Sequence, residues 1–136
     1  MDRTEQTRAM VRRYYDSLIE RDWDAFVALL TEDVRYEMPQ TSERIIGKKR
    51  YLRFNQEYPG DWQLSVTRLV ADGSTAAASA NFTVADDRMV GVTFFELDGD
   101  LISRVTDFWP EPYEPPAGRE HLVERLPGEV DRFSTS

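Results

Sequence analysis

The hydrophobic pattern of this 136-residue chain changes its period about halfway along, and this change limits the folds that the chain can adopt. In residues 4–20 the apolar side chains recur three and four positions apart, which is typical of one stripe of an amphipathic helix. From Trp62 onward apolar and polar residues alternate, which indicates strands with one buried face. Helices followed by consecutive strands predict an α+β fold in which the helices cover one face of a curved sheet.

The elements expected before Trp62 are two helices, a strand and a third helix. Asp22 is a suitable N-cap between the first two helices. Pro39 lacks an N–H donor and suits the end of the strand, which we expect at an edge of the sheet. The predicted segments are helices at 4–20 and 23–30, a strand at 34–38, a polar loop at 40–43 and a helix at 48–58.

Four further strands are expected, joined by short turns rich in Asp and Gly, and they form an antiparallel meander. The predicted strands are 62–70, 75–84, 88–97 and 101–109, and the element order is ααβαββββ. The C-terminal residues include Pro110, Pro112, Pro115, Pro116 and Pro127, and they indicate an extended arm around a weak helical segment at 119–126. We therefore expect one domain at 1–112 and a proline-rich tail at 113–136 that packs on it or extends from it.

Composition excludes several function classes. The net charge is −8, from 17 basic and 25 acidic residues, which argues against nucleic acid or an anionic membrane as a partner. The basic cluster at 48–53 is more typical of a solvated helix face than of a nucleic-acid site. No apolar run approaches the roughly 18 residues of a membrane span, and no signal peptide is visible, so a cytoplasmic protein is expected.

The sequence offers no pattern for a metal or an organic cofactor. Cysteine is absent, and the single histidine, His121, lies in the tail. The acidic pairs at 86–87 and 98–100 lie at strand turns, where Asp and Gly serve the turn geometry, and they lack the spacing of a calcium loop. No glycine-rich phosphate loop occurs, so we expect neither a metal nor an organic cofactor.

Asp107 lies inside the last predicted strand, beside Val105, Phe108 and Trp109. Alternation places Val105, Asp107 and Trp109 on one face of that strand. Burying an unpaired carboxylate is costly, so Asp107 is either a functional residue of a catalytic or binding site or the partner of Arg104, Arg119 or a tail amide. Both explanations remain open from the residues alone.

The chain resembles the nuclear-transport-factor-2-like superfamily, and within it the SnoaL-like domains. The resemblance spans roughly 4–112 and rests on Val11–Tyr14, Asp22–Phe26, Ala28–Val34, Pro39, Gly47 and Val105–Trp109. It implies a cone-shaped half-barrel, in which a mostly antiparallel sheet wraps around three N-terminal helices and encloses a deep apolar pocket, usually in a homodimer. The superfamily includes many enzymes as well as proteins without catalysis, so the fold alone does not name a function.

Two enzyme families of this superfamily match the chain only in part. Tyr14 falls where ketosteroid isomerases have their oxyanion-hole tyrosine, but Met38 and Thr93 stand in place of their two aspartates. Asp107 is similar to the last-strand aspartate of limonene epoxide hydrolases, whose arginine and aspartate partners correspond to Asn81 and Thr83. The resemblance therefore implies a single carboxylate, as in polyketide cyclases, because two-group acid–base chemistry lacks its second group.

The leading hypothesis is a cofactor-independent isomerase, cyclase, lyase or hydrolase acting on a small apolar molecule. Its catalytic candidates are Asp107 and Tyr14. Its pocket candidates are Trp23, Tyr36, Met38, Met89, Thr93, Phe95 and Trp109, although such side chains are more often plain core. The alternatives are a non-catalytic protein that binds a hydrophobic ligand, and a dimeric interaction module with an incidental cavity.

Overall fold

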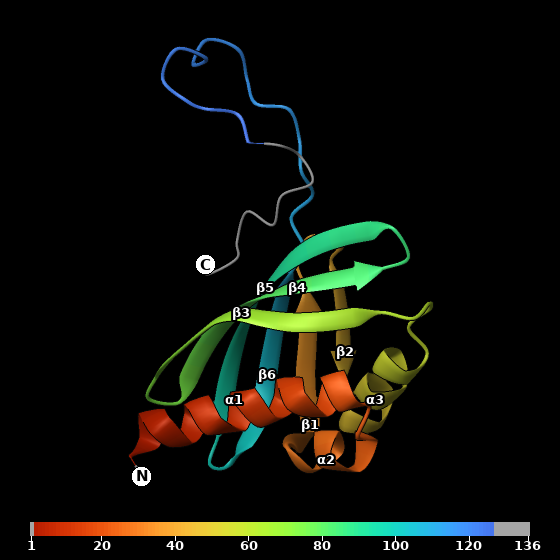
Figure 1. The fold of residues 1–136 in the computed structure, drawn as a ribbon. Coiled ribbons are helices and arrows are strands. Elements are labelled where there is room, and N and C mark those ends of the chain that lie inside the picture. The colour runs from red at the N-terminus through yellow and green to blue at the C-terminus, as the bar shows by residue number, and fades with distance from the viewer. Residues whose placement is uncertain (1, 127–136) are drawn as a thin grey trace.

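A six-stranded sheet curves around the N-terminal helices in this computed structural model, which describes residues 2–126 (Figure 1). The helices are α1 (Arg3–Glu20), α2 (Trp23–Ala28) and α3 (Lys48–Gln56). The strands are β1 (Leu30–Met38), β2 (Glu43–Ile46), β3 (Gln63–Asp72), β4 (Thr75–Val84), β5 (Asp87–Asp98) and β6 (Leu101–Phe108). The predicted α+β half-barrel is confirmed, and none of the helices within 2–126 is long and apolar enough to cross a membrane.

The strand order in the sheet is β2-β1-β6-β5-β4-β3, so the sheet stays open, with β2 and β3 at its edges. Strands β3 to β6 form the predicted antiparallel meander. The pairing of β1 with β6 is parallel and sets Tyr36 opposite Val105. The first and the last long strands therefore lie side by side.

The predictions for the first strand and the loop after it are wrong in part. Strand β1 begins at Leu30, and it lies between β2 and β6 rather than at an edge. The chain then reverses in a turn where Ser42 adopts a left-handed conformation (φ 58°) and its N–H donates to the Pro39 carbonyl at 3.2 Å. The β-branched pair Ile45 and Ile46 continues as β2, where we expected no strand.

The core fills the space between the helices and the concave face of the sheet. Along α1 the predicted stripe is buried at Val11, Tyr14, Tyr15 and Leu18. On β6 the residues Ile102, Val105 and Asp107 are buried, so the face predicted for Asp107 is the inner one. Alternation is thus preserved at the end of the last strand, where it decides the orientation of the carboxylate.

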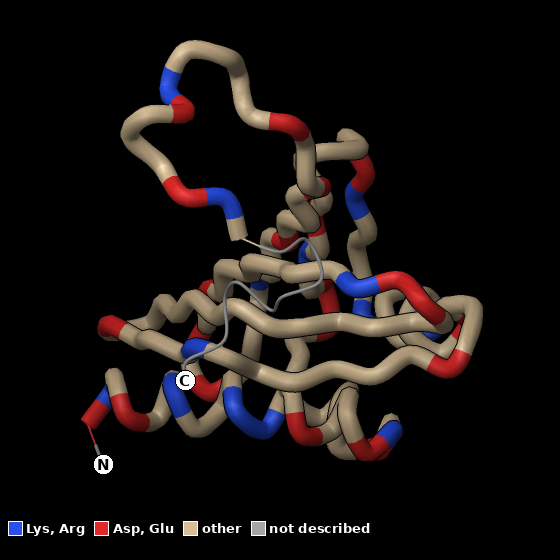
Figure 2. Tube along the Cα trace, turned by 45° about the horizontal axis from the view of Figure 1, so that its top comes forward, with Lys and Arg blue, Asp and Glu red and all other residues tan. Residues whose placement is uncertain are grey.

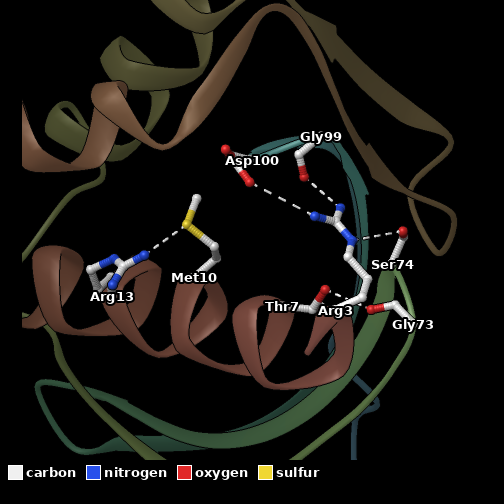
Figure 3. A network of polar contacts seen from close by, with 8 residues as sticks. All are labelled: Arg3, Thr7, Met10, Arg13, Gly73, Ser74, Gly99 and Asp100. Carbon is white, nitrogen blue, oxygen red and sulfur yellow. Dashed lines mark hydrogen bonds and ion pairs between the residues drawn. The ribbon is translucent and has the colours of Figure 1, made fainter. Parts of the chain in front are cut away.

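Polar contacts fix the start of α1 to two hairpin turns (Figure 3). The Thr7 hydroxyl donates to the Gly73 carbonyl at 2.6 Å, and Arg3 Nε donates to the Ser74 hydroxyl at 3.1 Å. The Arg3 guanidinium also donates to the Gly99 carbonyl. These contacts hold α1 across the sheet and so fix the register of the helix side chains that face inward.

The chain after β6 extends away from the body without regular structure as far as residue 126 (Figure 1). The helical segment predicted at 119–126 is wrong, because only a turn forms there, with the Leu122 N–H donating to the Arg119 carbonyl at 3.0 Å. Tyr113 and Leu122 are exposed, and a short helix with no surface to pack against is unstable. Pro127 and the remainder of the predicted tail lie outside the described residues.

Candidate functional site

A cavity of about 240 Å³ lies between α1, α3 and the concave face of the sheet. Its walls are mainly aromatic, with one carboxylate. The lining residues are Tyr14, Tyr15, Leu18, Tyr36, Met38, Tyr51, Phe54, Asn55, Tyr58, Trp62, Leu64, Ala80, Phe82, Met89, Gly91, Thr93, Asp107 and Trp109. Pockets for drug-sized ligands have volumes of about 300–1,000 Å³, so this cavity suits a smaller molecule.

Most of the residues proposed from the sequence meet at this cavity, but two do not. The lining includes Tyr14, Tyr36, Met38, Met89, Thr93, Asp107 and Trp109. Phe95 is not among the lining residues, because it lies deeper in the core with its ring centroid 5.1 Å from that of Tyr14. Trp23 is also outside the lining and packs edge-on against Phe26 on α2, at a centroid distance of 6.0 Å.

Asp107 accepts hydrogen bonds from three side chains. The Tyr36 hydroxyl donates to Oδ2 at 2.6 Å, and Trp109 Nε1 donates to the same oxygen at 2.9 Å. The Thr93 hydroxyl donates to Oδ1 at 2.7 Å. The topology explains the cluster: Thr93 is the cross-strand partner of Asp107, Trp109 follows on the same face, and β1 brings Tyr36 alongside.

The electrostatics of Asp107 are dominated by its burial. The residue is 8% exposed, and this desolvation raises the pKa of its carboxyl, while the bonds from Thr93, Tyr36 and Trp109 partly offset the rise. The pairing with Arg104 considered from the sequence is wrong, because Arg104 Nε donates to Glu37 Oε1 at 2.7 Å. Within residues 2–126 no salt bridge reaches Asp107, so its charge is balanced by neutral donors.

Tyr14 is buried against Tyr51, and their hydroxyls share a hydrogen bond. The Tyr36 ring stacks on Tyr51 at a centroid distance of 4.6 Å and an interplanar angle of 24°. Burial raises the pKa of Tyr14 and of Tyr51, so both hydroxyls stay protonated near neutral pH. The predicted hydrogen-bond donor Tyr14 therefore already has a partner inside the protein.

Sequence reasoning missed several lining residues, above all Tyr15 and Tyr51. Both lie on helices with an apolar side, so the pattern marks them as core and gives no sign that they face a cavity. The Tyr15 hydroxyl is buried beside the Thr93 hydroxyl, and among the described residues it makes no hydrogen bond of good geometry. No cluster of His, Asp and Glu within 2–126 is arranged to hold a metal ion.

Comparison with known proteins gives the family. The model of the SnoaL-like domain matches residues 11–105, which is most of the chain. This chain is a member of the SnoaL-like domain family. The resemblance found in the sequence is thereby confirmed, and among curated proteins none matches the SnoaL-like chain significantly.

Solved structures with the same SnoaL-like fold include one of high identity. A Kribbella flavida protein, provisionally described as a ketosteroid isomerase, is 69% identical over 96% of this chain and 97% of its own, with a TM-score of 0.91. A Pseudomonas putida protein, provisionally described as a polyketide cyclase, is 30% identical over 76% and 91%, with a TM-score of 0.64. An LEH-like epoxide hydrolase of M. tuberculosis, 21% identical over 80% and 86%, shares the fold at a TM-score of 0.71.

Proposed function

We propose that this SnoaL-like protein is a cofactor-independent enzyme that moves a proton within a small, largely apolar molecule, with Asp107 as general base and general acid. The observation that carries the proposal is a buried carboxylate at an aromatic-lined cavity, held by neutral donors alone within the described chain. Burial raises the pKa of Asp107 above that of an exposed carboxyl group, which makes the carboxylate a stronger base for removing a proton. The similarity to proteins provisionally described as an isomerase and a cyclase supports the same class.

The hydrogen bonds of Asp107 distinguish its two oxygens. Oδ2 accepts from Tyr36 and Trp109, whereas Oδ1 accepts only from Thr93 in the part of the chain that the structure describes. A carboxylate oxygen accepts about two hydrogen bonds, so Oδ1 is the oxygen with capacity left for a substrate proton. In the proposed step a C–H bond breaks, its proton moves to Oδ1 and its electron pair stays in the substrate. The resulting carboxylic acid then returns the proton to another atom of the same molecule, without net oxidation or reduction.

Related enzymes carry a second acid–base residue at positions that correspond to Met38, Thr93, Asn81 and Thr83, and none of these four side chains can take that role in this chain. Met38 lines the cavity with a thioether, and Thr93 uses its hydroxyl to support Asp107. Asn81 and Thr83 flank Phe82 on β4, and only Phe82 is a lining residue. These placements support chemistry by one carboxylate and argue against a ketosteroid-isomerase or epoxide-hydrolase arrangement of paired groups.

Hydrogen exchange in a small ketone tests the proposal, because it needs only proton removal by Asp107, exchange of that proton with the solvent and return of a deuteron to the same carbon. We would incubate 2-decalone with the protein in D₂O and follow deuterium at the carbons next to the carbonyl by NMR. We expect exchange above the solvent rate with the wild type and loss of that excess in Asp107→Asn. Glu96→Gln, which alters an exposed carboxylate near Arg104, is the control and should keep the excess.

A ligand-binding protein without catalysis is the second candidate, and one observation favours it. Three side-chain donors already form hydrogen bonds with the Asp107 carboxylate. These bonds would hold the carboxylate in position to anchor a polar atom of a ligand. Trp62 and Trp109 line the cavity, so binding of 2-decalone can be followed by tryptophan fluorescence. Binding of 2-decalone by the wild type with exchange at the solvent rate would favour this candidate and overturn the enzyme.

We further propose that the protein is a homodimer that pairs the outer faces of two sheets. The helices cover the concave face, and β4 and the middle of β5 carry no charged residue, as the long uncharged stretches in Figure 2 illustrate. Phe94 is 49% exposed on the outer face, and its ring contacts that of Phe108 at a centroid distance of 6.1 Å. An apolar patch of this kind on a sheet indicates a protein interface.

A further inference from the structure

A groove between the edge strand β2 and α3 combines an apolar floor with a basic rim. Its volume is about 530 Å³, a size at which proteins bind ligands and peptide side chains. Its lining residues are Ile45, Lys49, Arg50, Arg53, Phe54 and Glu57. Ile45 and Phe54 are half-buried and pack against the core, and Phe54 alone of the six also lines the cavity. The groove therefore offers apolar surface and positive charge side by side.

Two cations of this rim have no ionic partner in the described chain. Arg53 pairs with Glu57 at 2.7 Å, one turn further along α3. Lys49 and Arg50 are exposed and make no ion pair within residues 2–126. In a chain whose net charge is −8, a site of this sign attracts a partner that carries carboxylates.

The C-terminal arm, residues 110–126, has the opposite charge and exposes apolar side chains. Four glutamates and two arginines give it a formal charge of −2 with its histidine neutral. Tyr113 is 85% exposed and Leu122 is 76% exposed. Among the described residues Glu111 and Glu124 form no ion pair. The arm thus offers the two features that complement the groove, free carboxylates and uncovered apolar groups.

Local contacts give the arm a shape of its own away from the body (Figure 1). Arg125 pairs with Glu114 at 3.4 Å, which closes the segment between them into a loop. At its tip the Gly118 N–H donates to the Glu120 carboxylate at 3.0 Å. No hydrogen bond or ion pair between the described residues joins the arm to the body. A short loop that leaves its apolar side chains in water indicates a surface elsewhere that covers them.

The groove of the same copy lies near the base of the arm, yet the arm does not enter it. The Trp109 N–H donates to the side chain of Gln40, which lies in the turn just before β2. None of the groove's lining residues belongs to the arm. Proline-rich segments extend by about 3.1 Å per residue, so residues 110–118 span roughly 25 Å beyond the body. That length carries the loop to a second copy.

We propose that the arm of each copy docks in the groove between β2 and α3 of a second copy, so that the two copies exchange arms. Leu122 then covers Ile45 and Phe54, and Glu124 pairs with Arg50. The inference goes beyond the proposed enzyme and rests on the proposed homodimer, which brings the second copy close. In a two-fold dimer each copy gives one arm and receives one, so both grooves are filled.

Single cysteines test this exchange cleanly, because the chain has none of its own. Gln56→Cys places a thiol at an exposed position of α3 beside the groove, and Ala117→Cys places one in the arm; neither removes a proposed contact. The two variants are mixed in urea, refolded together and treated with a short bismaleimide. We expect a product in which mass spectrometry finds positions 56 and 117 joined, which can form only between copies. Arg8→Cys, exposed on α1, replaces Gln56→Cys in the matched control.

Charge reversal tests the recognition itself. Arg50→Glu in the copy that carries Gln56→Cys should slow formation of the 56–117 product by about three- to tenfold, because carboxylates then face each other. Glu124→Arg in the copy that carries Ala117→Cys should have a similar effect. The two reversals mixed should restore the rate, since each copy supplies one side of the contact. Arg68→Glu, at an exposed position of β3, is the control and should leave the rate unchanged.

Three results overturn the inference. The first is a 56–117 product no more abundant than the product of the Arg8→Cys control. The second is a Gln56→Cys, Ala117→Cys double variant that cross-links only within one chain, which would place the arm in its own groove. The third is an unchanged rate in both Arg50→Glu and Glu124→Arg, which would leave the groove to a different anionic partner.

The outcomes separate arm exchange from the outer-face dimer and from the enzyme. If the wild type is a dimer but the 56–117 product does not form, the outer-face dimer stands and arm exchange falls. If Phe94→Glu stays dimeric and still gives the product, arm exchange stands and the outer-face dimer falls. A monomeric wild type overturns both. Asp107→Asn should leave cross-linking unchanged, so its effect on deuterium exchange tests the enzyme alone.

Discussion

Thr93 and Asp107 face each other directly across β5 and β6, and the Thr93 hydroxyl donates to Asp107 Oδ1 at 2.7 Å. This bond favours the ionised carboxylate and is the largest influence that lowers the pKa of Asp107 against its burial. The strength of Asp107 as a base therefore depends on a hydroxyl on the neighbouring strand.

Replacing Thr93 by valine keeps the shape of the side chain and removes this donor. We expect Thr93→Val to raise the pKa of Asp107, so that the carboxylate form and the exchange activity appear at higher pH than in the wild type. Carbon-13 NMR of the Asp107 carboxyl group, followed through a pH titration, measures the shift directly. Thr83→Val makes the same change on β4 outside the lining and should leave the titration where it is.

The pH dependence of stability follows from the same carboxyl group. Burial raises the pKa of Asp107 in the folded protein, so between the ordinary carboxyl pKa of about 4 and the folded value the unfolded chain binds fewer protons. The free energy of unfolding should therefore fall as pH rises through this window. Asp107→Asn should remove that fall, as measured by urea denaturation at a series of pH values. Parallel curves for the wild type and Asp107→Asn would contradict this expectation, and Asp86→Asn controls for the loss of one charge.

The hydroxyls of the adjacent tyrosines Tyr14 and Tyr15 on α1 should contribute differently to stability. Tyr51→Phe leaves the buried Tyr14 hydroxyl without a bond inside the protein and should cost about 1–3 kcal/mol of unfolding free energy. Tyr15→Phe removes a buried hydroxyl that makes no hydrogen bond of good geometry with its neighbour Thr93, so it should cost less unfolding free energy than Tyr51→Phe. Urea denaturation of both variants measures the contrast. An equal loss in the two would show that Tyr15 is satisfied within the protein.

Gly91 makes room for the Trp109 ring. A Cβ at position 91 would lie 2.7 Å from Cη2 and Cζ3 of Trp109, so Gly91→Ala must displace a side chain that donates to Asp107. We expect a loss of about 1–3 kcal/mol in unfolding free energy, typical of overpacking, together with a changed tryptophan fluorescence spectrum. In a Trp109→Leu background the same substitution should cost much less. If Gly91→Ala lowers the unfolding free energy equally in the wild type and in Trp109→Leu, the strain does not come from contact with the Trp109 ring.

The outer sheet face gives a prediction for the oligomeric state. Phe94→Glu places a charge in the middle of the proposed interface and should convert the dimer into a folded monomer, as measured by light scattering after size exclusion. Val70→Glu, at a 63% exposed position on the edge strand β3, is the control and should remain dimeric. A monomeric wild type, or a Phe94→Glu variant that stays dimeric, would contradict the proposed interface.

The hydrophobic periodicity of the sequence predicted the helices and strands that are long enough to show a regular pattern. The stripe of α1, the strands after Trp62 and the shared face of Val105 and Asp107 follow from spacings of a few residues, whereas the inward direction of that face was implied by the family resemblance. Alternation also sets Arg104 and Asp107 on opposite faces of β6, which is why Arg104 bonds Glu37 outside the cavity. The short strand β2 was missed because four residues are too few to show a period.

The composition of the site depends on contacts that no local pattern contains. Tyr36 and Asp107 meet only because β1 and β6 pair in parallel across 71 residues of sequence. Whether Tyr15 and Tyr51 face solid core or a cavity depends on how completely their neighbours fill the space between helices and sheet. The sequence therefore predicted the carboxylate, whereas its donors required the folded structure.

The parallel pairing of β1 with β6 also bears on the order in which the protein acquires its site during synthesis. Strand β1 leaves the ribosome early but has β2 as its only sheet neighbour until β6 follows, after most of the described chain. The bond from Tyr36 to Asp107 and the bond from Thr93 form only when that last strand inserts between β1 and β5. We therefore expect the nascent helices and the β3–β5 meander to collapse beforehand, and the cavity to be completed only when β6 has paired.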